Sequence, residues 1–261
     1  FDPCMLPAEI DAVEAFVAER GLTPVRLVLT HSHWDHILGP ERFPNVPTLA
    51  QAAYLDETAP EHAPHIARQV AQWEAKCGVE RAGAFEIPRP DETFGTDTTV
   101  HVGGEALRLR HAPGHAADQL VAHHAASATL WASDLLSDVE IPYVSHSLAA
   151  FEATLQTLSG WDVEVLVPGH GNPSDTAAAY RGRVAEDRAY LAELRQRVAE
   201  AIRKGRSVEA AVADCAGMAF RHPKDNAGPH RLNVQSAYLE LGGPADAGSV
   251  GWRAAERKGE A

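Results

Sequence analysis

Thr30-His31-Ser32-His33-Trp34-Asp35-His36 follows the apolar run Val25-Arg26-Leu27-Val28-Leu29 and places three imidazoles and one carboxylate close together in the chain. Burying these groups in a protein core would require a separate polar partner for each, because an unpaired buried polar group is strongly destabilising. A metal site is the simpler explanation, since imidazole and carboxylate groups are common metal ligands.

The spacing within this stretch indicates how the ligands are divided. If a strand ends at Thr30, His31 and His33 lie two residues apart in extended chain and project to the same side, so both can bind one ion. Asp35 and His36 lie beyond a turn and can face a second ion. Catalytic loops usually follow the carboxyl ends of strands, so we expect a solvent-facing pocket here.

The pattern His31-x-His33-x-Asp35-His36 resembles the signature of the metallo-β-lactamase-fold superfamily. In that family three further ligands follow later strands, and matching residues are present: His115 after Ala112-Pro113-Gly114, Asp134 after Ala132-Ser133, and His170 after Val167-Pro168-Gly169. The resemblance runs from Phe1 to about Pro173. It implies that one ion is held by His31, His33 and His115, the other by Asp35, His36 and His170, with Asp134 bridging the two.

The resemblance also implies a cofactor and a reaction. Two divalent metal ions are expected, most simply Zn²⁺, although Fe or Mn accept the same nitrogen and oxygen ligands. A metal-bridging hydroxide would attack an ester, thioester or lactone, with Asp35 or Asp134 as the catalytic carboxylate that orients the hydroxide and moves its proton. True zinc β-lactamases usually lack a bridging carboxylate at the position of Asp134, which favours a glyoxalase II-like or lactonase-like hydrolase.

Two alternatives stay open from the sequence. Persulfide dioxygenases of the same superfamily hold a single iron with the equivalents of His31, His115 and Asp134, a ligand set suited to oxygen chemistry. A non-catalytic relative is the other alternative. It is disfavoured because none of the seven ligands is missing.

The composition limits the partners. The 23 Lys and Arg residues against 36 Asp and Glu residues give a net charge of −13, which argues against nucleic acid and anionic membranes as partners. We expect a small-molecule substrate and leave a homo-oligomer open. Three widely spaced cysteines predict no disulfide framework and favour the cytoplasm. An apolar stretch of about 18 or more residues, as a transmembrane helix requires, is not found.

The expected fold class is α/β, and the resemblance implies the αββα sandwich of the metallo-β-lactamase fold. We predict a catalytic domain over residues 1–173 and a C-terminal helical segment over residues 174–261, packed on the same domain. Phe1 to Met5 matches an aspartate-containing turn of the family, so strands that normally precede this turn are expected to be missing from the N-terminus of the chain.

Hydrophobic periodicity predicts the individual elements. Helices are expected over residues 7–20, 62–76, 148–158, 174–204, 208–216 and 231–241, the fourth with Ser174 as its N-cap. Strands are expected over residues 25–30, 48–54, 99–102, 106–109, 119–122, 129–132 and 163–167.

Four residues are candidates for substrate binding. Tyr143 and His146 lie on the segment that follows Asp134, although simple packing of that segment is an equal alternative. Lys224 and Arg231 belong to a basic link that begins at Arg221. In some thioester hydrolases of the superfamily a C-terminal helical segment binds an acidic carrier, so we hypothesise an anionic substrate here. A solvated loop is the competing interpretation.

Overall fold

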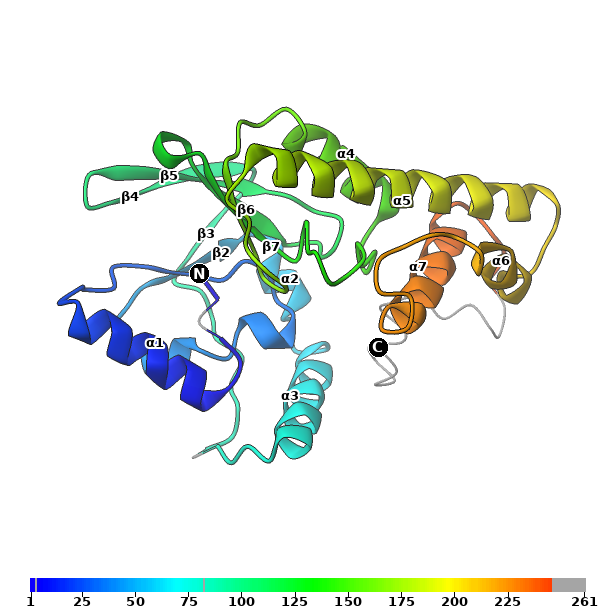
Figure 1. Cartoon of the computed structure of the whole chain (residues 1–261). Helices are drawn as coiled ribbons and strands as arrows, with labels where there is room; N and C mark the ends of the chain where they lie inside the picture. The colour runs from blue at the N-terminus through cyan, green and yellow to red at the C-terminus, as the bar shows by residue number, and fades with distance from the viewer. Residues whose placement is uncertain (3, 82, 246–261) are drawn as a thin grey trace. The chain divides into compact units, whose positions relative to one another are not determined.

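The computed structural model describes residues 1–245 except residues 3 and 82, and these residues form two compact units. Unit 1 consists of Phe1–His111 and Ala117–Leu120, and unit 2 consists of Ala112–Ala116 and the chain from Val121 onward. The predicted α/β class is confirmed, because sheets are accompanied by helices in this fold (Figure 1). The predicted domain boundary at residue 173 stays a prediction.

Unit 1 contains a three-stranded parallel sheet in the order β1-β2-β3. Its strands are β1 (Leu27–Val28), β2 (Thr48–Gln51) and β3 (Glu92–Phe94). The expected strand over residues 25–30 is therefore much shorter. Val25 is 51% exposed, and the backbone N–H of Thr30 donates to the side chain of Asp2 rather than to a neighbouring strand. β3 was not predicted from the sequence.

The helices of unit 1 are α1 (Pro7–Glu19), α2 (Tyr54–Glu57) and α3 (Ala63–Cys77), with short 3₁₀ turns at Trp34–His36 and Pro40–Arg42. The helix predicted over residues 7–20 is present, but little of its apolar surface is buried. Ile10 is its one buried residue, and Phe16 is 50% exposed. A separate buried cluster around β1 and β2 is formed by Leu29, Ile37, Ala50, Tyr54 and Ile66.

A long antiparallel hairpin of β4 (Asp97–Val102) and β5 (Glu105–His111) also belongs to unit 1 (Figure 1). Its two connecting residues, Gly103 and Gly104, have φ values of +59° and +89°. Two-residue hairpin turns of this kind need positive φ at both positions, which glycine adopts without a steric cost. The sequence therefore fixes both the turn and the strand register here.

Unit 2 is built on β6 (Leu120–His124), β7 (Thr129–Ser133) and β8 (Val165–Pro168), of which β6 begins at a residue of unit 1. β7 lies between the other two, antiparallel to β6 and parallel to β8. A 3₁₀ turn at Ala125–Ser127 connects β6 to β7. Helix α4 (Leu148–Leu158) begins after Ser147, whose hydroxyl caps the backbone N–H of Ala150.

Up to residue 245, unit 2 also contains three C-terminal helices: α5 (Ala177–Arg203), α6 (Val208–Cys215) and α7 (Ala227–Glu240). The predicted N-cap of α5 is wrong. Thr176 caps that helix, whereas the backbone of Ser174 pairs with Leu166. α7 begins four residues earlier than expected, at Ala227 rather than Arg231.

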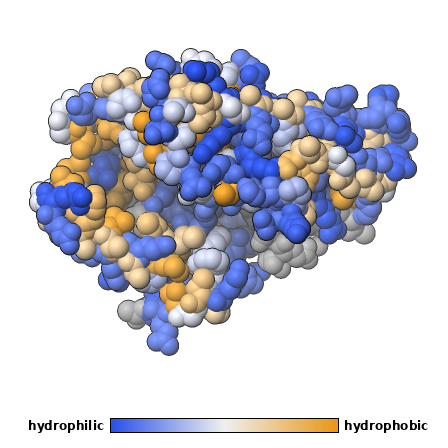
Figure 2. Space-filling view, viewed as in Figure 1, coloured by the Kyte–Doolittle hydropathy of each residue, from blue (hydrophilic) through white to orange (hydrophobic). Residues whose placement is uncertain are grey.

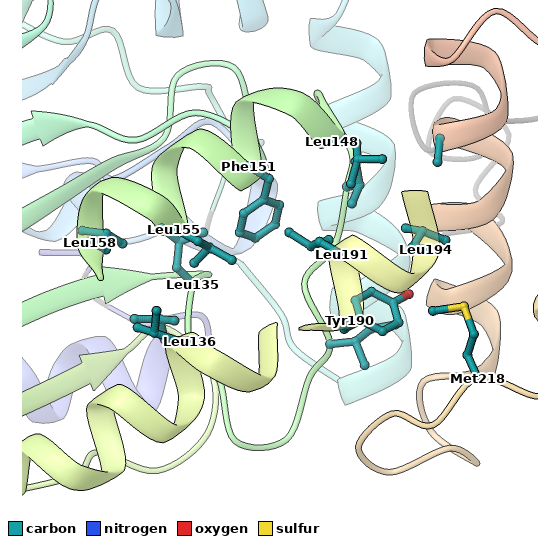
Figure 3. Packing of buried hydrophobic residues seen from close by; sticks show 14 of the residues in the cluster. Leu135, Leu136, Leu148, Phe151, Leu155, Leu158, Tyr190, Leu191, Leu194 and Met218 are labelled. Atoms are coloured by element: carbon teal, nitrogen blue, oxygen red, sulfur yellow. The ribbon is translucent and has the colours of Figure 1, made fainter. Parts of the chain in front are cut away.

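One apolar core joins the C-terminal helices to β7, β8 and α4. Figure 3 shows Phe151 and Leu155 of α4 near Leu191 of α5, while Met218 extends toward Tyr190. Burial of each such side chain contributes roughly 1.5–3 kcal/mol. The helical segment after residue 174 is therefore an integral part of unit 2.

The surface is largely polar on the face drawn in Figure 2, with hydrophobic groups interspersed. Among the helices of the described residues, none combines the length and the apolar character that spanning a bilayer requires. The three cysteines, Cys4, Cys77 and Cys215, are all free thiols.

Candidate metal centre

Unit 1 gathers the ligands of the first motif immediately after β1. The chain leaves this short strand as a loop, and a 3₁₀ turn follows at Trp34–His36, in which the N–H of His36 donates to the carbonyl of His33. The ring of His31 lies 4.5 Å from that of His33 and 4.1 Å from that of His36, between centroids. We call His31, His33, Asp35 and His36 the N-terminal ligand set.

The carboxylate of Asp2 holds this set in place. It accepts the backbone N–H of Thr30 at 2.8 Å and the Thr30 hydroxyl, and it lies 3.0 Å from Nδ1 of His36. The Thr30 hydroxyl also lies 3.3 Å from Nδ1 of His31. Sequence reasoning recognised the turn that contains Asp2 but gave it no role at the site.

These contacts determine which imidazole nitrogen faces inward. A carboxylate only accepts hydrogen bonds when ionised, so Nδ1 of His36 carries the proton and Nε2 keeps its lone pair. The Thr30 hydroxyl gives its proton to Asp2 and is left to accept from Nδ1 of His31. Metal-binding histidines typically have this arrangement, with one nitrogen bonded to a second group and the other directed at the ion.

Unit 2 gathers His115, Asp134 and His170, which we call the C-terminal ligand set. Asp134 Oδ2 lies 3.4 Å from Nε2 of His115 and 3.6 Å from Nε2 of His170. The side chains of His115 and Asp134 are buried, whereas that of His170 is 27% exposed. One carboxylate oxygen thus lies close to two imidazole nitrogens.

A break in strand pairing directs Asp134 to this position. The register between β7 and β8 shifts between Trp131 and Ser133, and Ser133 has a φ of +49°. Such irregularities turn the chain at a strand end and are common beside functional sites. The carbonyl of Ser133 accepts the N–H of Gly169 at 2.7 Å, which ties the segment before His170 to the segment before Asp134.

Both the side chain and the backbone carbonyl of His115 are held by residues 143–145. Its Nδ1 lies 3.1 Å from the carbonyl of Tyr143, and its own carbonyl accepts the hydroxyl of Ser145. Gly114 has a φ of +144° and packs against the backbone of Phe151 in α4, so that a Cβ at this position would overlap that helix. Glycine is required before His115 for both reasons.

The predicted substrate-binding residues lie in unit 2. Tyr143 is half-buried, its ring centroid lies 6.4 Å from that of His115, and its hydroxyl donates to Asn226. His146, Lys224 and Arg231 are exposed. Arg221, by contrast, forms a buried ion pair with Asp187 at 2.5 Å. Substrate contact by the four predicted residues stays a prediction.

Asp118 is a buried carboxylate that the sequence interpretation missed. It is 1% exposed, and burial raises its pKa to about 7, although the side chain of Ser32, between His31 and His33, opposes the shift. Its position three residues after His115 was a signal that the motif search did not use. Both Asp118 and Ser32 belong to unit 1.

We expect Asp118→Asn to change how the stability of the metal-free protein depends on pH. Between about pH 4 and 7 the unfolded chain has lost this proton while the folded chain retains it, so raising the pH favours unfolding. The free energy of unfolding of the variant, relative to that of the wild type, should therefore rise over this range by on the order of 1 kcal/mol per pH unit. Urea unfolding at several pH values in the presence of a chelator measures it.

Asp91→Asn is the matched control for this prediction. Hydrogen bonds from the backbone and hydroxyl of Thr48 lower the pKa of Asp91. Its contribution to stability is therefore lost only as the pH falls below about 4. The difference between this variant and the wild type should stay constant from pH 5 to 8. The same constancy in Asp118→Asn would contradict the prediction.

The donor chemistry of both ligand sets fits a metal ion. His and Asp groups among the described residues can hold one, and imidazole nitrogen with carboxylate oxygen suits zinc, iron or manganese. The buried His31, His36 and His115 have their Nδ1 atoms placed against other groups. That leaves Nε2 as the ligand atom in each case.

Comparison with known proteins identifies similar chains. A family model described as Metallo-beta-lactamase superfamily matches residues 4–170. Hydroxyacylglutathione hydrolase from Acidiphilium cryptum (strain JF-5) is 29% identical over 198 residues, covering 71% of this chain and 69% of that protein. An acyl-coenzyme A thioesterase from Gallus gallus is 26% identical over 171 residues, covering 62% of this chain and 61% of that protein.

Among solved structures, the fold is similar to a stereoselective inverting sec-alkylsulfatase from Pseudomonas sp. The TM-score is 0.72 at 18% identity, and the match covers 95% of this chain but 46% of the other. The chain therefore spans about half the length of that protein. At this identity the likeness supports the fold alone.

Proposed function

We propose that this chain, which belongs to the metallo-β-lactamase superfamily and is a metallo-hydrolase, hydrolyses an ester, thioester or lactone with two divalent metal ions. The observation that carries the proposal is the position of the Asp134 carboxylate, directed at His115 and at His170. A carboxylate that lies close to two imidazoles, each a proposed ligand of a different ion, is suited to bridging those ions.

We propose that the two ligand sets act together. His31, His33 and His115 would hold one ion, Asp35, His36 and His170 would hold the other, and Asp134 would bridge them. Zinc is the metal that we propose, since the ligands are nitrogen and oxygen atoms. When bound, a pair of such ions supplies an activated water at neutral pH and polarises the carbonyl of the substrate.

The remaining steps are proton transfer and substrate placement. Asp134 and Asp35 would accept the proton of the attacking water, because ionised carboxylates are acceptors and both lie beside metal-binding imidazoles. Tyr143, beside His115, would form a wall against the acyl group, and His146 would line the entrance. These roles need no Ser or Cys nucleophile.

A thioester with an anionic carrier is the substrate class that we favour. Both relatives reported above carry names of enzymes that release an acyl group from a thiol carrier, glutathione or coenzyme A. The exposed Lys224 and Arg231 would attract an anionic carrier, whereas the net charge of −13 disfavours nucleic acid.

Metal analysis combined with a substrate panel tests the proposal. The purified protein is analysed for metals, stripped with a chelator and reconstituted with zinc. Hydrolysis is then measured on a neutral aryl ester, a lactone, an S-acyl glutathione and an acyl-coenzyme A. We expect about two zinc ions per chain, loss of hydrolysis on stripping and its recovery on reconstitution. Charge reversal in Lys224→Glu/Arg231→Glu should raise KM for the two anionic thioesters and leave KM for the neutral ester unchanged.

Two results would contradict the proposal. One iron per chain, together with oxygen uptake on a persulfide and no hydrolysis, would indicate dioxygenase chemistry. Full hydrolysis by the metal-free protein would remove the metal ions from the mechanism.

A further inference from the structure

The segment that follows Asp134 is held by side chains from the far end of the sequence. We call residues 135–146 the pocket loop. Arg221 donates to the carbonyls of Ser137 and Glu140, and Asn226 donates to the carbonyl of Val139. Asn233 in α7 binds the same segment at two backbone positions. We propose that Asn233 is a positioning residue for His115, acting through the peptide between Tyr143 and Val144.

Asn233 binds the pocket loop on both sides of Tyr143. It is fully buried, its Nδ2 donates to the carbonyl of Pro142 at 2.7 Å, and its Oδ1 accepts the N–H of Val144 at 2.8 Å. Asn233 thus uses its donor and its acceptor on one short stretch of backbone, which fixes the orientation of that stretch as well as its position.

The geometry of a trans peptide carries this constraint to His115. The carbonyl of Tyr143 and the N–H of Val144 belong to the same peptide unit, in which they point in opposite directions. Because Asn233 holds the Val144 N–H, the Tyr143 carbonyl must point away from Asn233. On that side it lies 3.1 Å from Nδ1 of His115.

This contact determines the tautomer of His115. A carbonyl oxygen only accepts, so Nδ1 of His115 carries a proton, and Nε2 is the nitrogen that would present its lone pair to a bound metal ion. Nε2 lies 3.4 Å from Asp134 Oδ2. Partners of this kind behind metal-binding histidines contribute about 10- to 100-fold to metal affinity.

Asn233 is itself held rigidly. Its Nδ2 donates to the hydroxyl of Tyr190 at 3.0 Å, and that hydroxyl lies 2.9 Å from Nδ1 of His230 in the same helix. Tyr190, His230 and Asn233 are all buried. The amide therefore has a single orientation, which lets helix α7 set the geometry of a ligand that precedes it by more than a hundred residues.

The first test reads the tautomer directly in the metal-free protein. Long-range ¹H–¹⁵N correlation spectra distinguish a protonated Nδ1 from a protonated Nε2, and the His115 signals are assigned by their loss in His115→Gln. We expect Nδ1 of His115 to be protonated throughout the wild-type sample, and Asn233→Ala to contain a population in which Nδ1 carries no proton. The control is Tyr238→Phe, which removes one buried hydrogen bond from α7, to the carbonyl of Arg206, without touching the pocket loop.

The second test measures zinc affinity by competition with a chelator. This test rests on the proposed function, whereas the tautomer test uses the metal-free protein and does not. A wild-type protein that binds no zinc would therefore contradict the proposed metal site, and an unchanged His115 tautomer would contradict this inference. Asn233→Ala should bind zinc about 10- to 100-fold more weakly, and Tyr238→Phe should bind it as the wild type does.

Tyr190→Phe keeps the inference falsifiable if Asn233→Ala does not fold. Tyr190→Phe removes the hydroxyl that anchors the Asn233 amide. We therefore expect the same changes in the His115 tautomer and in zinc affinity, but smaller ones. A wild-type His115 tautomer in folded Asn233→Ala or Tyr190→Phe would overturn the inference. Equal changes in Tyr238→Phe would also overturn it, because they would indicate a general loss of stability.

Discussion

Replacing Asp134 with alanine should lower kcat/KM by about 100- to 1000-fold, the scale on which removing a single charge-stabilising group affects a catalytic site. The carboxylate is directed at His115 and at His170, so its removal takes one ligand from both proposed ions. We also expect the metal content to fall below two ions per chain. Steady-state kinetics on the best substrate and elemental analysis of the same preparation measure both effects.

Asp214→Ala is the control for this prediction. Asp214 is a carboxylate of unit 2 that forms an exposed ion pair with Arg206. Exposed pairs contribute only about 0–1 kcal/mol to stability, so activity and metal content should match the wild type. Asp134→Asn separates shape from charge: it keeps one oxygen ligand and should retain more metal than Asp134→Ala. Wild-type turnover in Asp134→Ala would exclude a bridging role.

The sequence predicted elements well where one periodicity dominates. Helix α4 has the predicted bounds, residues 148–158, because Phe151, Leu155 and Leu158 form a continuous buried stripe next to a Ser147 cap. Helix α1 also has nearly the predicted bounds, but hydrophobic periodicity does not determine how much of a helix finds a packing partner, and only Ile10 of α1 is buried. The strand at residues 25–30 was overestimated for a similar reason, because its pairing depends on neighbours distant in sequence.

At the candidate site, the sequence predicted the ligands but not the groups that orient them. Residue types and spacing selected four of the proposed ligands, His31, His33, Asp35 and His36, and the family resemblance added His115, Asp134 and His170. As a ligand set, these seven residues stay a prediction. The groups behind the ligands were not selected. Thr30 and the carbonyl of Tyr143 contact imidazoles of the proposed ligands, but hydroxyls and carbonyls are present throughout any chain. Only the folded arrangement distinguishes these from the rest.

Asp2 is the clearest example of a group that spacing does not reveal, and its replacement is the second prediction with a large effect. The carboxylate accepts from the backbone and hydroxyl of Thr30 and lies 3.0 Å from Nδ1 of His36. Asp2→Ala removes all of these contacts at once. We expect zinc affinity to fall about 10- to 100-fold, because the orientation and tautomer of His36 are no longer fixed. Chelator competition with zinc measures the change.

A graded series tests whether the effect arises from these contacts. Asp2→Asn keeps one acceptor oxygen, so it can serve the Thr30 N–H or the pair formed by the Thr30 hydroxyl and His36, but not both. Its zinc affinity should therefore lie between those of the wild type and Asp2→Ala. Asp11→Ala, which breaks an exposed ion pair with Arg42 in the same unit, should leave the affinity unchanged. Wild-type zinc affinity in folded Asp2→Ala would show that His31 and His36 are oriented without Asp2, and that the backbone after β1 alone positions the N-terminal ligand set.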